Sequence, residues 1–176
     1  MGQSLERYEV KIFQKLLFVL AGLGFVAFGA WAHAAEGDDA MKRAKKIDRL
    51  RGSAMHLQGW SAGPMVAMIK KQTPYDAQAF NTQAKRLAAL AEMVEDLFRE
   101  DLRSFALDTE AKPEIWDDYA EFSRLASNLV DSSSKLAAVS ANGDLVSSSK
   151  AFTAVADDCK ACHCLLYTSP SPRDRS

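Results

Sequence analysis

The sequence predicts an all-α protein, an antiparallel four-helix bundle. Apolar residues recur at three-, four- and seven-residue spacings over four stretches between residues 38 and 163, and no stretch alternates with the two-residue period of a β-strand. The chain has 176 residues, 48% hydrophobic and 26% charged, which suits a globular domain with a hydrophobic core. Its formal net charge of −1 argues against a dedicated nucleic-acid-binding protein, because such proteins are normally strongly basic.

The N-terminal segment has the pattern of an export signal. Residues 16–32 carry no charge and follow three basic residues, and Ala32 and Ala34 are the small residues that a signal peptidase reads. We therefore expect residues 1–35 to be a signal peptide and the folded part to be exported. The alternative is a retained membrane anchor, because this apolar run approaches the roughly 20 residues that span a bilayer.

The first two helices are predicted from apolar stripes. The first is expected from about residue 38 to 71, with a kink or brief break at Gly63–Pro64. Thr73 followed by Pro74 predicts an N-cap and a first helical position for the second helix. The first stripe comprises Ile47, Leu50, Ala54, Leu57 and Ser61, and the second comprises Phe80, Ala84, Leu87, Ala91, Val94 and Phe98.

The last two helices follow a long connection over residues 99–112, where the apolar pattern is lost. Pro113 is expected to begin the third helix. Asn142–Gly143 is expected to end it, and Asp144 to cap the fourth. Along the third helix a seven-residue repeat is typical of a bundle seam and comprises Ile115, Phe122, Leu129 and Leu136.

The fourth predicted helix ends in Cys159-Lys160-Ala161-Cys162-His163. C-x-x-C-H is the attachment signature of a c-type haem. Two thiols at i and i+3 on a helix can reach one porphyrin edge, and the imidazole that follows can bind the iron. The motif therefore predicts one covalent haem c on Cys159 and Cys162, with His163 as iron ligand. Export agrees with this prediction, because bacteria attach haem covalently on the periplasmic side.

Three other interpretations of these residues remain open. A zinc site could draw on Cys159, Cys162, His163 and Cys164, although adjacent residues do not readily close a tetrahedron. A thioredoxin-like redox pair would be expected at a helix N-terminus after a strand rather than here. A plain structural disulfide is the third, since exported proteins readily oxidise paired cysteines.

Residues 164–176 form a tail without apolar periodicity. They resemble a common sequencing adapter translated in one reading frame, so we expect the native sequence to end near His163 and the tail to be disordered. The alternative is a genuine short disordered terminus. This places the domain at residues 36–163.

That domain resembles the class II c-type cytochromes, the cytochrome c′ family. Besides the haem motif, the resemblance rests on four strings: residues 51–55 (RGSAM), 74–77 (PYDA), 112–116 (KPEIW) and 143–145 (GDL). It implies a left-handed, periplasmic, often dimeric bundle that holds one haem. The family's usual continuation after the histidine is replaced here from Cys164 onward, which leaves that wall of the pocket unspecified.

The resemblance also implies which residues lie on the side of the haem opposite His163. Met55 takes the position that faces the open iron coordination site, and Arg51 is expected to pair with a haem propionate. With Met55 as sixth ligand, the protein is expected to be an electron carrier rather than an enzyme. The alternative is a five-coordinate protein that binds NO or CO behind Met55 as a pocket wall. Residues 36–163 carry 17 basic and 20 acidic residues, a net charge of −3, which favours redox partner proteins with basic patches.

Overall fold

The structure, a computed structural model, describes residues 37–166 and is helical with no β-strand in that range. These residues divide into a short N-terminal part that ends at Ala44 and a larger unit that begins at Lys45, and each is described by itself. In the part up to Ala44, residues 37–44 are helical, and Lys42 forms ion pairs with Asp38 and Asp39. No helix over residues 37–166 is long and apolar enough to cross a membrane.

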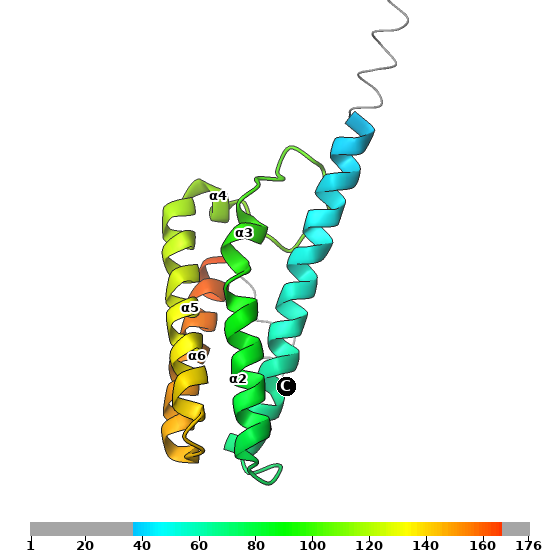
Figure 1. Ribbon diagram of the computed structural model, residues 1–176. Helices are drawn as coiled ribbons and strands as arrows, with labels where there is room; N and C mark the ends of the chain where they lie inside the picture. The colour runs from blue at the N-terminus through cyan, green and yellow to red at the C-terminus, as the bar shows by residue number, and fades with distance from the viewer. Residues whose placement is uncertain (1–36, 167–176) are drawn as a thin grey trace, which may run out of the picture. The chain divides into compact units, whose positions relative to one another are not determined.

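Four long helical segments of the larger unit run lengthwise (Figure 1). The first helix covers its residues 45–69, and the second segment consists of two pieces, α2 and the short α3. A one-turn helix, α4, precedes the long α5, which packs against both α2 and α6. The bounds are α2 Ala77–Ala91, α3 Val94–Phe98, α4 Glu114–Asp117, α5 Tyr119–Ser140 and α6 Leu145–Leu166. The predicted all-α four-helix bundle is confirmed, and successive long helices run in opposite directions (Figure 1).

The core follows the predicted stripes of the second and third helices. All six residues of the second stripe, from Phe80 to Phe98, are buried. The seven-residue repeat of the third helix is buried as well, from Ile115 to Leu136. Phe122 lies against Phe98 at a ring-centroid distance of 5.3 Å, so the two stripes meet in one cluster.

The predicted stripe of the first helix is wrong in part. Leu50 and Leu57 are 45% and 49% exposed, whereas Arg51 and Gln58 are buried on the same helix. The buried face is therefore rotated by one residue from the apolar stripe. Ala54 and Ser61 are buried as predicted, and Met65 and Met68 extend this face into the core.

The first helix does not break at Gly63–Pro64. Helical backbone continues through both residues to residue 69. Pro64 has no N–H to donate to the Trp60 carbonyl, but Trp60 is 59% exposed, so this carbonyl lies on the solvent side of the helix where water can bind it.

The second helix begins at Ala77 rather than at Pro74. Asp76 is its N-cap and accepts a hydrogen bond from the Ala79 amide at 2.9 Å. Residues before it belong to the turn that ends the first helix: Lys71 has a φ of 58°, and the Gln72 amide donates to the Ala67 carbonyl at 2.8 Å. The predicted N-cap at Thr73 is therefore wrong, because the preceding helix is still being capped there.

The third and fourth helices are joined by the predicted turn. Gly143 has a φ of 74°, a left-handed conformation that glycine adopts without strain. Asp144 then accepts hydrogen bonds from the Val146 and Ser147 amides at 3.2 and 2.8 Å. Hydrogen bonding by the Ser147 side chain, followed by these two amides, holds the pKa of the Asp144 carboxyl below its ordinary value. The cap at Asp144 is thus confirmed, and it fixes where α6 starts.

The C-terminal end of α6 lies three residues beyond the position expected from sequence, at Leu166 rather than His163. The remainder of the predicted tail, residues 167–176, lies outside the described residues. So does the predicted signal peptide, residues 1–35.

Candidate haem site

The C-x-x-C-H motif occupies the last turns of α6, on the side of that helix that enters the core. Ser148, Val155 and Cys162 follow one another at seven-residue spacing and are 0%, 1% and 8% exposed. Cys162 therefore continues the buried seam of α6. Cys159 lies one turn earlier, partly buried, and packs against the same apolar cluster.

Both thiols are free and lie in surroundings that favour the neutral form. Burial raises the pKa of Cys162 to about 11, and burial followed by the Asp158 carboxylate raises the pKa of Cys159. A redox-active pair of the thioredoxin type has a lowered thiol pKa. The raised pKa values of Cys159 and Cys162 therefore argue against that interpretation. Two neutral thiols on one helical edge of an apolar cluster fit the edge of an apolar macrocycle.

The zinc interpretation fails on geometry within residues 37–166. No group of three or more His, Cys, Asp and Glu side chains in that range is placed to hold a metal ion. His163 is exposed on α6 and lies about 100° around the helix from Cys162, so their side chains leave the helix in different directions.

Met55 lies on the first helix, partly buried, and packs against the cluster that contains Cys162. His56 is exposed, as its position beside Met55 on the helix predicts. The structure therefore brings Met55, Cys159 and Cys162 to one apolar cluster.

Arg51 is 3% exposed, and the structure gives it two partners on the main chain. Its Nε donates to the Leu97 carbonyl at 2.8 Å and its Nη2 to the Glu100 carbonyl at 2.5 Å. Both acceptors lie at the C-terminal end of α3, where a helix leaves carbonyls without partners. The predicted contact between Arg51 and a haem propionate stays a prediction.

Aromatic rings enclose the Arg51 guanidinium. Its Cζ lies 4.9 Å from the centroid of Phe98 and 5.1 Å from that of Trp116, within cation–π range. The Trp116 indole donates to the Phe98 carbonyl at 2.9 Å, which fixes α4 against the end of α3. Burial lowers the pKa of Arg51, while the Asp48, Glu100 and Asp101 carboxylates act in the opposite direction. Arg51 therefore ties the helix that carries Met55 to α3 and α4.

Replacing Arg51 with Met should destabilise the fold by about 2 to 3 kcal/mol, because two carbonyls lose their donor and the ring contacts lose their charge. Urea unfolding followed by circular dichroism measures the change. Arg49→Met is the matched control, since Arg49 is exposed on the same helix. Equal midpoints for the two variants would contradict the role assigned to Arg51.

Trp60 and Trp116 differ in their surroundings. Trp60 is 59% exposed, with the Arg86 guanidinium 5.3 Å from its ring centroid. Trp60 thus lies on the surface of the first helix, whereas Trp116 packs against the Arg51 guanidinium.

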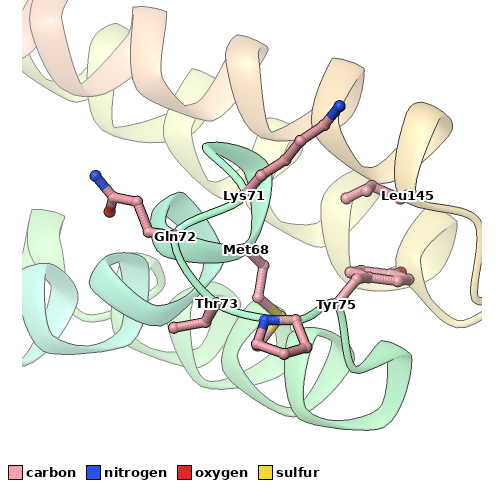
Figure 2. A pocket seen from close by; sticks show the side chains of 7 residues that line it. Met68, Lys71, Gln72, Thr73, Tyr75 and Leu145 are labelled. Carbon is pink, nitrogen blue, oxygen red and sulfur yellow. The ribbon is translucent and has the colours of Figure 1, made fainter.

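A shallow surface pocket lies at the other end of α6 and is not part of this site. Figure 2 shows it around the turn after the first helix, with Tyr75 and Leu145 close together at one side. Leu145 begins α6, and Cys159 lies fourteen residues later, about 21 Å along the helix axis. The pocket is therefore remote from the haem motif.

Sequence reasoning did not single out Gln58. It is 8% exposed and follows Arg51 by seven residues and Met55 by three. That spacing is the signal that could have identified it, because it places a polar residue on the same helix face as two predicted haem-facing residues.

Comparison with known proteins agrees with the motif and the fold. The family described as Cytochrome C′ matches residues 46–164. A cytochrome c′ of Alcaligenes xylosoxydans xylosoxydans is 34% identical over 132 residues, which cover 73% of this chain and 93% of the relative. The solved cytochrome c′ of Shewanella frigidimarina has a TM-score of 0.65 at 31% identity, covering 70% of this chain and 94% of that one. A ferrous cytochrome c′ variant of Alcaligenes xylosoxidans with bound NO also gives 0.65, at 30% identity and coverages of 72% and 97%. The chain is therefore a haem c protein and belongs to the cytochrome c′ family.

Proposed function

We propose that this protein is a periplasmic monohaem electron carrier rather than an enzyme. In this proposal, Cys159 and Cys162 hold the haem by thioether bonds, His163 is the proximal iron ligand and Met55 is the sixth. The observation that carries it is the shared cluster: a methionine from the first helix packs against the same apolar core as the two cysteines of α6. When bound, haem c supplies a one-electron ferric/ferrous couple.

The chain's own residues support this role by positioning. The seam of Ser148, Val155 and Cys162 fixes the rotation of α6, so that Cys162 faces the core. Arg51 holds the first helix to the end of α3, one turn from Met55, and so limits how far Met55 can move. A thioether ligand favours the ferrous state, so Met55 would raise the reduction potential.

The second candidate is a vacant-site protein that binds NO or CO. It is supported by the related cytochrome c′ whose structure contains bound NO. Here Met55 would be an adaptable apolar wall beside the open position, a role for which methionine is commonly used.

Export and partners follow the same proposal. Periplasmic location is inferred from the family and from the N-terminal signal pattern. Redox partners with basic surfaces would be steered by the net acidic domain. A homodimer stays a prediction, and the exposed stripe of Leu50, Leu57 and Trp60 on the first helix is a surface that suits it.

Spectra of the ferrous protein before and after addition of CO test the choice between the two candidates. Met55 ligation predicts a low-spin ferrous spectrum and slow or weak CO binding, because CO must displace a ligand. A high-spin ferrous spectrum with immediate CO binding would replace the carrier with the gas-binding candidate. Absence of any haem absorption would refute both.

A further inference from the structure

Two neighbouring polar side chains on the buried face of the first helix have no hydrogen-bond partner within the described part of the chain. Gln58 is 8% exposed and its Nε2 is unpartnered, and Ser61 is 1% exposed with an unpartnered Oγ. Buried amides are almost always hydrogen-bonded, because leaving one unpaired is strongly unfavourable. The Gln58 amide can therefore donate a hydrogen bond, and residues 37–166 supply no acceptor for it.

Helix geometry places this donor beside Met55. Gln58 is three residues after Met55, about 60° around the helix and 4.5 Å along it. It is seven residues after Arg51, within about 20° of the same direction. Arg51 points toward the end of α3, and Met55 packs on the cluster that contains Cys162. Gln58 therefore shares the face that the proposed function assigns to the open side of the haem.

We propose that the Gln58 side-chain amide donates a hydrogen bond to a small diatomic ligand, of the CO and NO class, bound on the Met55 side of the haem. The proposal rests on the haem site that both candidate functions share, and it adds a residue that controls how strongly a diatomic ligand is held once the position beside Met55 is open. An amide donor is suited to the partial negative charge on the outer atom of a ferrous-bound diatomic.

Ser61 provides a matched control on the same helix. It is also buried and unpartnered, but it lies six residues from Met55, about 9 Å along the axis and 120° around it. A donor at that position is too far from Met55 to reach the same ligand. Substitution of Ser61 therefore reports the effect of removing any buried polar atom from this face.

The experiment uses the ferrous haem-loaded protein with CO, in the wild-type chain and in a Met55→Leu background that keeps the position open. Gln58→Met conserves volume and removes the amide. The C–O stretching frequency should rise, because a donor at the outer atom weakens the C–O bond and its loss restores it. CO should also dissociate about fivefold faster, the effect of one lost neutral hydrogen bond. Ser61→Ala should change neither quantity.

The outcomes separate this proposal from the function on which it rests. Absence of a haem spectrum in the parent protein refutes the proposed function itself. A normal CO complex whose stretching frequency is unchanged by Gln58→Met overturns the Gln58 proposal alone. An equal shift from Ser61→Ala overturns it too, because the shift would then report repacking. Lower resistance to urea in Gln58→Met without a change in the CO frequency would identify Gln58 as a structural residue and likewise overturn it.

Discussion

A double variant with Cys159→Ala and Cys162→Ala is expected to contain no covalently bound haem. Both thiols lie on the same edge of α6, one buried and one partly buried, and each provides one thioether bond in the proposed attachment. Without both thiols, iron ligation and apolar contacts are the only interactions left to hold the haem, and neither is covalent attachment through the porphyrin. Acid–acetone extraction should then recover all the haem from the variant and none from the wild type.

Cys164 provides the control for this result. It is a free thiol on the same helix, but it is exposed and lies outside the motif. Cys164→Ala should retain haem as the wild type does. Extraction-resistant haem in the double variant, or its loss from Cys164→Ala, would show that the attachment residues are assigned incorrectly.

Met55→Leu is expected to change the iron from low spin to high spin and to lower the reduction potential. Leucine preserves size and apolarity but cannot donate a sulfur lone pair, so the variant loses the ligand with little change in packing. The free energy of unfolding should change by less than about 1.5 kcal/mol. Absorption spectra, CO binding and potentiometric titration measure the three changes in ligation, access and potential.

Met65→Leu tests whether any methionine replacement on this helix has the same effect. Met65 is fully buried in the core and lies ten residues after Met55. Its replacement should leave spin state, CO binding and potential unchanged. If the wild type is already high spin and Met55→Leu alters none of the three, Met55 is a pocket wall and the protein is the gas-binding type.

The sequence was most informative where burial requires only apolar side chains. Phe80, Leu87 and Phe98 on the second helical segment, and Phe122 and Leu136 on α5, are all buried as their periodicity predicts. The C-x-x-C-H motif predicted the haem attachment site equally well, because its chemistry depends on local spacing. The turn at Gly143 and Asp144 was also predicted, since both residues act through their own backbone.

The first helix could not be read in the same way. Arg51 is buried because its donors meet carbonyls at the end of α3, a partner that lies 46 residues away in the chain. Leu50 is exposed beside it, so the apolar pattern gives the wrong face. The connection between residues 99 and 112 also hides a buried Leu102 without periodic neighbours. These features depend on tertiary contacts, which hydrophobic periodicity does not encode.

The most direct test of the account is the mass and thiol content of the intact, denatured protein after production with haem attachment. If Cys159 and Cys162 together hold one haem, the mass should equal that of the chain without its signal peptide plus one haem, and an alkylating reagent should label Cys164 alone among the three cysteines. A chain of unmodified mass with all three cysteines labelled would contradict the covalent haem site at the centre of the account.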